Sequence, residues 1–220
     1  MNFCPIFINM KDKKCIIVGG GRIAYRKIKT LLQYDAMIEV ISPEVILEIE
    51  VLAADRIISI RKKIYEQGDL RGARLVFAAT DQRTVNAAVA EEARQMDIFV
   101  NCIDAPQQSS FISPAVFQDG DLSIAVSTGG HFPKLARKIK QELKNRYQDK
   151  YAEVLKALDK LRQRALLEIY DEQVRKKIFD KAVEDDILDI ALHKGITALE
   201  EKYNELFEEY CNEKKDNTGI

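Results

Sequence analysis

A glycine-rich segment near the start of the chain has the residue types that a phosphate-binding loop needs. It reads Gly19-Gly20-Gly21-Arg22-Ile23-Ala24 and fits the pattern G-x-G-x-x-A. In that pattern the first glycine permits a tight turn, the second lets a pyrophosphate approach the backbone, and the third small residue lets a helix pack on a strand. Free N–H groups at the start of such a helix bind anions. The segment predicts a dinucleotide site, and the alternative is a tight turn without a ligand.

The end of the next apolar run bears on the choice between NAD and NADP. The chain there reads Ile41-Ser42-Pro43-Glu44, without the acidic residue that usually ends this strand and binds the ribose. Ser42 is placed to reach a ribose hydroxyl, and Glu44 is nearby but past the strand. The sequence places no arginine at this strand end for a 2′-phosphate, so NAD is favoured over NADP.

Ala79-Thr80-Asp81 follows the fourth apolar run of the chain. In a doubly wound sheet this edge lies beside the cofactor, so we expect Ala79 and Thr80 to contact it. The alternative is that Thr80 or Asp81 only caps the following helix. The two roles are compatible.

Asn101 and Asp104 follow the fifth apolar run, in the segment VNCIDAP. Ligands of open α/β sheets bind at the carboxyl ends of the strands, so Asn101 is expected at the cofactor and Asp104 beside the nicotinamide ring. Taking a hydride from a C–H bond leaves a proton to be removed, and a carboxylate within reach can accept it. The alternative is that Asp104 caps the loop before Pro106.

The elements that must position these residues alternate along the first half of the chain. Apolar runs predict strands at Lys14–Gly19, Met37–Ser42, Arg56–Lys62, Arg74–Thr80 and Ile98–Ile103. Amphipathic segments predict helices at Arg22–Tyr34, Glu44–Ala54 and Thr84–Met96. This alternation indicates βαβ units and a parallel, doubly wound α/β sheet of the Rossmann type.

The pattern changes after Asp104. Phe111–Phe117 and Leu122–Ser127 predict two strands, and the Asp-Gly pair between them is a strong hairpin signal. Apolar residues three or four apart then predict helices at Pro133–Arg146, Ala152–Ile169, Glu172–Val183, Asp185–His193 and Ala198–Tyr210. We predict a Rossmann domain over residues 1–110, a hairpin and helix for dimerisation and substrate over 111–146, and a helical C-terminal domain over 147–220.

Composition excludes several classes of protein. The net charge of −1 gives no general attraction to nucleic acid or to an anionic membrane. Apolar runs are too short for a transmembrane helix or a signal-peptide core. The cysteines are widely spaced without a CxxC pair, and both histidines stand alone, so we expect no metal site and no disulfide framework. Free thiols without an export signal indicate the reducing cytoplasm.

Several motifs, in order, resemble the family of precorrin-2 dehydrogenases and sirohydrochlorin ferrochelatases, which also forms the N-terminal half of siroheme synthase. The resemblance runs from about Pro5 to Leu143. It is carried by the segments Pro5–Phe7, Ile16–Lys27, Ala78–Asn86, Val100–Pro106, Ser110–Ala115 and Ala125–Leu143. It implies NAD-dependent oxidation of precorrin-2 to sirohydrochlorin, with insertion of Fe²⁺ as a second activity that the sequence does not decide.

The resemblance also implies roles for individual residues. The glycine loop would hold NAD, with Arg22, Ile23, Pro43 and Glu44 near it. Asp104 would match the family's catalytic aspartate, in dehydrogenation and in metal insertion. The tetrapyrrole pocket would be lined by Ser127, Thr128, Gly129 and Gly130. The hairpin and the following helices would form a homodimer.

A basic helix face fits a substrate that carries carboxylates. Lys134, Arg137 and Lys138 lie at i, i+3 and i+4 of the helix predicted from Pro133, and we expect the first two to contact substrate. The start of this helix, with its free N–H groups, also favours anions. The alternative is a solvated helix face. His131 is adjacent, and either a substrate or a metal role is open for it.

A different class of protein is a non-catalytic NAD sensor, whose helical tail transmits the occupancy of the Rossmann domain to a partner. A sensor needs no carboxylate beside the nicotinamide and no tetrapyrrole pocket. Asp104 and the Ser127–Gly130 segment therefore favour the enzyme. A DNA-binding protein is disfavoured because no basic recognition helix precedes the glycine loop.

Overall fold

The computed structural model describes residues 3–149 and 151–217. Contacts divide these residues into two compact units. One holds the chain as far as Ser113 together with Gly129–His131, and the other holds Pro114–Thr128 and the chain from Phe132 onward. The predicted domain boundaries at residues 110 and 146 stay predictions.

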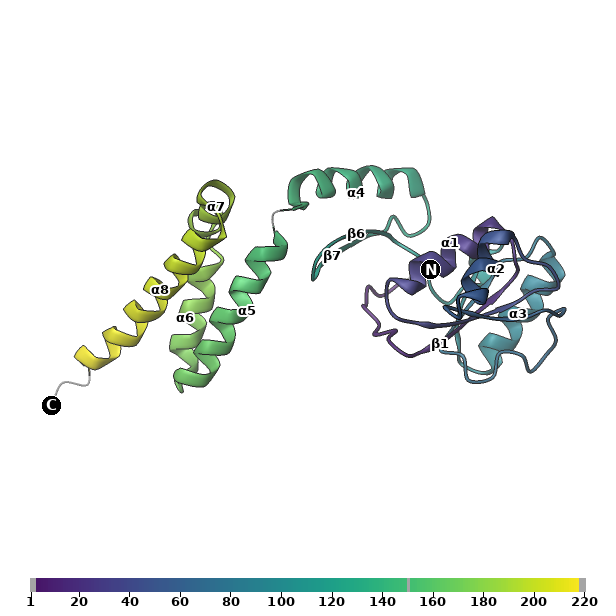
Figure 1. The fold of residues 1–220 in the computed structure, drawn as a ribbon, viewed down its shortest axis with the longest axis horizontal. Coiled ribbons are helices and arrows are strands. Elements are labelled where there is room, and N and C mark those ends of the chain that lie inside the picture. The colour runs from purple at the N-terminus through teal and green to yellow at the C-terminus, as the bar shows by residue number, and fades with distance from the viewer. Residues whose placement is uncertain (1–2, 150, 218–220) are drawn as a thin grey trace. The chain divides into compact units, whose positions relative to one another are not determined.

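The first unit is built on a five-stranded parallel sheet in the order β3-β2-β1-β4-β5 (Figure 1). Its central strand β1 is apolar and buried, because residues on both sides of a doubly wound sheet are covered. The strands are β1 (Lys14–Val18), β2 (Met37–Ile41), β3 (Ser59–Arg61), β4 (Leu75–Ala78) and β5 (Phe99–Cys102). This order matches the first five strands of the classic Rossmann order 3-2-1-4-5-6, so the predicted fold class is confirmed.

Helices cover the two faces of this sheet through separate cores. Helices α1 (Arg22–Leu32) and α2 (Leu47–Ala54) bury Ile28 and Ile49 on the face that carries Ile17 of β1. Helix α3 (Arg83–Gln95) packs Val89, Ala90 and Ala93 on the other face. The apolar positions of α3 repeat at helical spacing, so a single stripe of that helix is buried.

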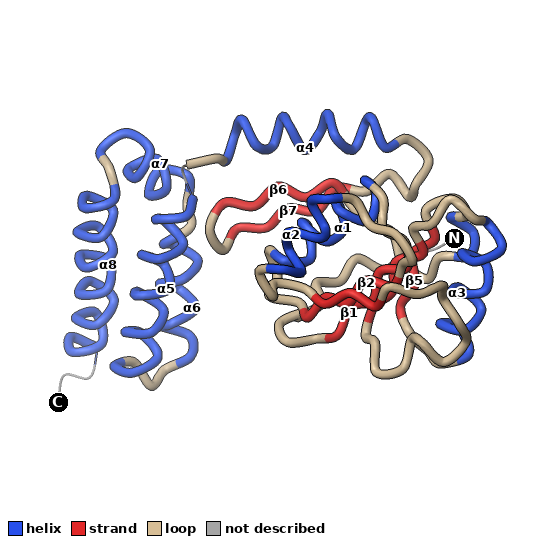
Figure 2. The backbone as a smooth tube through the Cα atoms, turned by 45° about the vertical axis from the view of Figure 1, so that its right-hand side comes forward, coloured by secondary structure: helices blue, strands red, loops and turns tan. Residues whose placement is uncertain are grey.

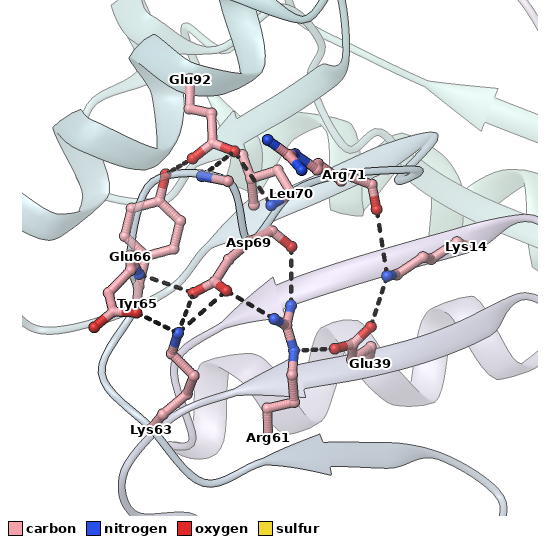
Figure 3. Close-up of polar contacts among 11 residues, drawn as sticks. Lys14, Glu39, Arg61, Lys63, Tyr65, Glu66, Asp69, Leu70, Arg71 and Glu92 are labelled. Carbon is pink, nitrogen blue, oxygen red and sulfur yellow. Dashed lines mark hydrogen bonds and ion pairs between the residues drawn. The ribbon is translucent and has the colours of Figure 1, made fainter.

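A loop covers the sheet between β3 and β4. Residues 62–74, all of them described, form turns and extended backbone, and Leu70 is fully buried against the face that α3 covers. Polar side chains hold this loop in place (Figure 3). The Arg61 guanidinium donates to Asp69 Oδ1 at 2.7 Å and to the Asp69 carbonyl at 2.9 Å, and it also pairs with Glu39. Glu39 is shared with Lys14 at 2.8 Å, so the loop is tied to β1, β2 and β3.

The second unit contains a two-stranded antiparallel hairpin and five helices (Figure 2). Strands β6 (Ala115–Asp119) and β7 (Leu122–Val126) are joined at Gly120, whose φ of 56° is the left-handed conformation that glycine tolerates. Helix α4 (Pro133–Tyr147) contacts both strands. The C-terminal helices are α5 (Tyr151–Glu168), α6 (Glu172–Ala182), α7 (Asp185–Lys194) and α8 (Ile196–Asn217).

The C-terminal helices share one apolar core. Each of α5, α6 and α7 buries at least one large side chain in it, and α8 buries at least two. Among them are Leu161, Ile178 and Ile187, and Leu199 and Phe207 of α8. Each comes from a stripe of apolar residues three or four apart, which explains why periodicity predicted these helices. None of the helices in the described residues is both long and apolar enough to cross a membrane.

Most predicted elements match the observed bounds within two residues, and four differ by three or more at one end. The helix predicted over Glu44–Ala54 begins at Leu47. The strand predicted over Phe111–Phe117 begins at Ala115, because the Phe111 ring packs edge-on against Phe77 at 5.5 Å and belongs to the first unit. The strand predicted over Arg56–Lys62 is only the three residues of β3. The last helix continues to Asn217, beyond the predicted end at Tyr210.

Candidate active site

The glycine loop is anchored on both sides by backbone hydrogen bonds. Gly19 N–H donates to the Ile41 carbonyl of β2 at 2.9 Å, and the Gly20 carbonyl accepts from Ile46 N–H at 2.9 Å. Gly21 is the N-cap of α1, and no side chain caps the helix there. The first N–H groups of α1 therefore keep their capacity to bind an anion.

The three glycines are required for different reasons. A Cβ on Gly19, whose φ is +122°, would lie 2.4 Å from the Ala79 carbonyl oxygen, and a Cβ on Gly20 would lie 2.0 Å from that of Glu44. Both positions are closed to a side chain by the protein itself. A Cβ on Gly21 would meet no atom within 4 Å. The space beside Gly21 and the helix start is thus open to a group that approaches the backbone, which fits a dinucleotide pyrophosphate.

A pocket of about 700 Å³ opens in front of this loop. That volume lies within the range of small-molecule and cofactor sites. Ten of the eleven predicted cofactor residues line it, namely Gly19, Gly20, Gly21, Arg22, Ile23, Ser42, Pro43, Glu44, Ala79 and Thr80. Their contact with a cofactor stays a prediction, but the fold brings them to one cavity from the ends of β1, β2 and β4. A larger hollow of about 1230 Å³ lies along β3 and α2, away from these residues.

Nine residues of the described pocket wall were not among the predicted cofactor residues. Two of them, Ile64 and Tyr65, come from the loop after β3. Ile64 is 68% exposed, which makes it an apolar surface available to a ligand. Burial raises the pKa of the Tyr65 hydroxyl, and the hydrogen bond to Glu92 raises it further. Tyr65 therefore stays a neutral wall of the pocket at physiological pH.

The predicted ribose residue is already engaged with its own turn. Ser42 Oγ donates to the Glu44 carbonyl at 2.6 Å and is 8% exposed. This bond uses the hydroxyl hydrogen, so Ser42 can only accept a hydrogen bond from a ribose. Glu44 itself is exposed at the pocket.

Asn86 joins the pocket to the predicted catalytic carboxylate. Its side chain lies in the first turns of α3 and is 1% exposed. Nδ2 of Asn86 donates to the Thr80 carbonyl and to Asp104 Oδ1, both at 3.0 Å. Oδ1 of Asn86 accepts from the Thr80 N–H at 3.1 Å and from its hydroxyl at 2.8 Å. Sequence spacing predicted Thr80 and Asp104 separately and missed the residue between them.

Asp104 is exposed just past the end of β5, before the short 3-10 helix Pro106–Gln108. Asn101, predicted at the cofactor, is absent from the described lining of the pocket, and its Nδ2 donates to the Phe111 carbonyl at 3.0 Å. That bond ties β5 to the segment that leaves the first unit. Cys102, the last residue of β5, is buried, and burial raises the pKa of its thiol to about 11.

Lys27 is a second residue that sequence analysis did not single out. Its Nζ donates to Ser113 Oγ at 3.1 Å and lies 4.8 Å from the centre of the Phe77 ring. Burial lowers the pKa of Lys27, and repulsion from Arg26 lowers it further. The lysine fastens the Ser113 segment to α1 and the sheet.

The predicted substrate residues belong to the region from β7 to α4. Thr128 Oγ1 accepts from the Phe132 N–H at 3.2 Å, which closes the loop before α4. Gly129 and Gly130 both have positive φ, at 63° and 84°. Lys134 and Arg137 are exposed on α4. Ser127 lies at the end of β7 and is also exposed.

Metal ligands do not cluster in the part of the chain that the structure describes: no group of three or more His, Cys, Asp and Glu side chains is arranged to hold an ion there. His131 is exposed beside Gly129.

Residues 6–115 match the family described as Putative NAD(P)-binding, and residues 119–146 match the one described as Sirohaem biosynthesis protein central. The siroheme synthase of Methylococcus capsulatus is 36% identical over 192 residues, which are 87% of this chain and 40% of that protein. The siroheme synthase of Citrobacter koseri is 32% identical over 219 residues, 100% of this chain and 47% of that protein. The chain thus spans less than half the length of these curated relatives.

A solved structure titled "SirC, precorrin-2 dehydrogenase" has a TM-score of 0.75 and 25% identity to this chain. The match covers 96% of this chain and 100% of that one. Together the matches confirm the resemblance predicted from the motifs. The match of residues 6–115 to the family described as Putative NAD(P)-binding confirms the predicted nicotinamide dinucleotide cofactor.

Proposed function

Because the chain belongs to the Putative NAD(P)-binding family, whose match covers half of its residues, we propose that it oxidises precorrin-2 to sirohydrochlorin with NAD⁺ in siroheme biosynthesis. The observation that supports this most directly is the hydrogen-bonded connection between the dinucleotide pocket and Asp104. A dinucleotide site alone would fit a sensor, whereas a carboxylate held at the same sheet edge supplies a proton acceptor.

The residues fit the chemistry of a dehydrogenation. One hydrogen of the substrate leaves as a hydride, which bound NAD⁺ accepts, and a second leaves as a proton. Asp104 is exposed at the strand edge where a reacting group is expected, and its carboxylate takes this proton. Thr80 and the glycine loop would hold the dinucleotide in the pocket that they line, and the bound dinucleotide would supply the hydride acceptor.

NAD rather than NADP fits the ribose end of the pocket. Arg22 is the one basic side chain among the described lining residues, and it lies in the first turn of α1 beside the pyrophosphate position. Glu44 lines the pocket three residues past the end of β2, where a 2′-phosphate would meet its negative charge.

The substrate carries carboxylate side chains, and α4 has the charge to meet them. Its sequence, PKLARKIKQELKNRY, contains six basic residues and one acidic residue. Lys134 and Arg137 are exposed near the helix start, where unpaired N–H groups also favour anions. Ser127, Thr128, Gly129 and Gly130 supply a loop that lets a flat ring approach the backbone.

The proposal extends to three further points. Sirohydrochlorin is released or is metallated with Fe²⁺ as a second substrate, with Asp104 accepting the pyrrole protons. The active enzyme is a homodimer formed through β6, β7 and the following helices. It works in the cytoplasm, where the exposed thiol of Cys4 stays reduced.

An anaerobic incubation of the full chain with precorrin-2 and NAD⁺ tests the proposal. NADH and sirohydrochlorin are followed together by absorbance, and Fe²⁺ is added after the first step is complete. We expect equal amounts of NADH and sirohydrochlorin, and for the second activity an iron step faster than in a protein-free control. NAD⁺ binding without any NADH would refute the dehydrogenase and favour the sensor.

A further inference from the structure

We propose that Asn86 is a positioning residue, which holds the Asp104 carboxylate in a fixed relation to Thr80 of the cofactor pocket. The inference rests on the proposed function, since it assigns a role to Asn86 in the same reaction. Asn86 does not line the pocket itself. It acts through the two residues that it contacts.

The amide of Asn86 is hydrogen-bonded on both sides. Both N–H groups of Nδ2 donate, one to the Thr80 carbonyl and one to Asp104, and Oδ1 accepts from the Thr80 N–H. The Thr80 hydroxyl lies 2.8 Å from Oδ1, and its single hydrogen is shared with the Gln82 carbonyl at 3.1 Å. Both donors of the amide are therefore used. The orientation of the amide is also fixed, because its carbonyl side faces the Thr80 N–H and its amino side faces acceptors only.

Burial makes this arrangement rigid. Asn86 is 1% exposed, and its backbone carbonyl lies 3.5 Å from the Cys102 thiol, which is also buried. Water therefore competes little for the bonds to Thr80 and Asp104. A polar side chain that is buried and hydrogen-bonded on both sides has few alternative positions, so it transmits the geometry of one partner to the other.

The bond to Asp104 leaves one of its oxygens for chemistry. Asn86 binds Oδ1 of Asp104 at 3.0 Å, and no donor from the described residues reaches Oδ2. Asn86 therefore fixes one oxygen of Asp104 and leaves the other available to accept a proton.

Neither aspartate nor alanine at position 86 would donate this hydrogen bond to Asp104. Aspartate has the same shape and still accepts from Thr80, but it places a second carboxylate against Asp104. Alanine removes the donor and leaves the Thr80 N–H and carbonyl, which lie behind the pocket wall, without their partner. The pair Asn86→Asp and Asn86→Ala thus removes the donor to Asp104 in two different ways.

The experiment compares steady-state kinetics and NAD⁺ affinity of the full-length wild type and these variants. We expect kcat to fall by about 10- to 100-fold, the range for losing a hydrogen bond to a charged group. The KM and the calorimetric Kd for NAD⁺ should stay within about threefold, because the pocket wall keeps its other contacts. Gln95→Ala is the matched control, since this amide lies at the exposed end of α3 and bonds only Glu91.

Each outcome decides between the possibilities. A wild-type protein that forms no NADH would refute the proposed function and not the role of Asn86 specifically. An active wild type with an unchanged kcat in both variants would overturn the positioning role. A rise in the NAD⁺ Kd that matches the loss of kcat would also overturn it, since Asn86 would then only shape the pocket. Failure of both variants to fold, with Gln95→Ala intact, would make Asn86 a purely structural residue.

Discussion

The hydroxyl of Tyr65 donates a hydrogen bond to the buried carboxylate of Glu92, so a wall of the pocket in front of the glycine loop is tied to the last turn of helix α3 (Figure 3). Glu92 is 5% exposed and also accepts from the Gly68 N–H at 3.0 Å and the Leu70 N–H at 3.2 Å. One carboxylate thus holds three groups of the loop between β3 and β4, in addition to the turn hydrogen bonds within the loop.

Replacing Glu92 should therefore affect both stability and cofactor binding. Glu92→Ala leaves the buried Leu70 N–H, the partly buried Gly68 N–H and the Tyr65 hydroxyl without their acceptor, and we expect a loss of about 3 kcal/mol in the free energy of unfolding. Denaturant titration measures it. NAD⁺ affinity should fall as well, because Tyr65 loses its fixed position. Glu91→Ala is the control, since Glu91 is exposed and pairs only at the surface of α3, and its cost should stay below about 0.5 kcal/mol.

Gly21 offers a test of the cofactor loop that spares the fold. A side chain at this position meets no protein atom within 4 Å, so Gly21→Asp should fold normally. Its charge and bulk would lie beside the expected pyrophosphate, and we expect NAD⁺ affinity to fall by about tenfold or more. Gly21→Asn separates crowding from charge. Unaltered calorimetric affinity in both variants would refute the loop as the cofactor site.

At Gly20 we expect a side chain to lower the stability of the fold. A Cβ there would lie 2.0 Å from the Glu44 carbonyl oxygen, so Gly20→Ala must displace backbone. We expect about 1–3 kcal/mol of lost stability, measured by thermal or denaturant unfolding. A Gly20→Ala protein as stable as Gly21→Ala would show that the loop is looser than its hydrogen bonds indicate.

Asp104 should be needed for turnover and not for cofactor affinity. Asp104 lies outside the described pocket lining, and Asp104→Ala should leave the NAD⁺ Kd nearly unchanged while sirohydrochlorin formation is abolished. Asp104→Asn keeps the size of the side chain but cannot accept a proton, so it should be as inactive as the alanine variant. Turnover at the wild-type rate in either variant would show that another group removes the proton.

The order of strands and helices was predictable from local pattern, because most strands of the first unit lie in apolar runs and most helices have an apolar stripe. The glycine loop was predictable for the same reason, since its conformation is set by neighbouring residues. Local pattern failed to predict the start of a strand where contacts with residues distant in the sequence determine the backbone. Phe111 is apolar and suits a strand, but Phe77 and Asn101 hold it against the first unit.

The sequence predicted the part of the candidate site that lies at strand ends and missed the part that depends on distant contacts. Residues at strand ends were found because all carboxyl ends of a parallel sheet meet at one edge. Tyr65 and Asn86 were missed, since the first lies on a loop held by Glu92 and the second points inward from a helix. Neither has a local sequence signal, because what identifies them is a hydrogen bond to a residue 27 or 18 positions away.

The described cysteines should differ sharply in reactivity. Cys4 is exposed, whereas Cys15 and Cys102 are buried and burial raises the pKa of each thiol to about 11. Alkylation requires the thiolate, so at pH 8 iodoacetamide should modify Cys4 in the native protein and leave the other two untouched. Peptide mass mapping before and after unfolding measures this. Modification of Cys102 at the rate of Cys4 would mean that the end of β5 opens readily.

Tyr203 gives a test in the second unit that includes pH. Its hydroxyl donates at 3.1 Å to the carbonyl of Ala182, the last residue of α6, where helix carbonyls lack an internal donor. Tyr203 is 3% exposed, so Tyr203→Phe should cost about 1 kcal/mol in the free energy of unfolding near pH 7. Tyr170→Phe is the control, because Tyr170 is 97% exposed and its hydroxyl should contribute almost nothing.

The pH dependence of this difference has a definite sign. Burial raises the pKa of Tyr203 from 10.0 to about 12, so the folded state favours the protonated phenol. The wild type therefore keeps the full contribution below about pH 10 and loses it as the pH rises toward 12. Tyr203→Phe has no such group, and the stability gap between the two proteins should narrow over this range, as followed by denaturant unfolding at each pH. A gap that stayed constant or widened would mean that the Tyr203 hydroxyl is not buried in solution.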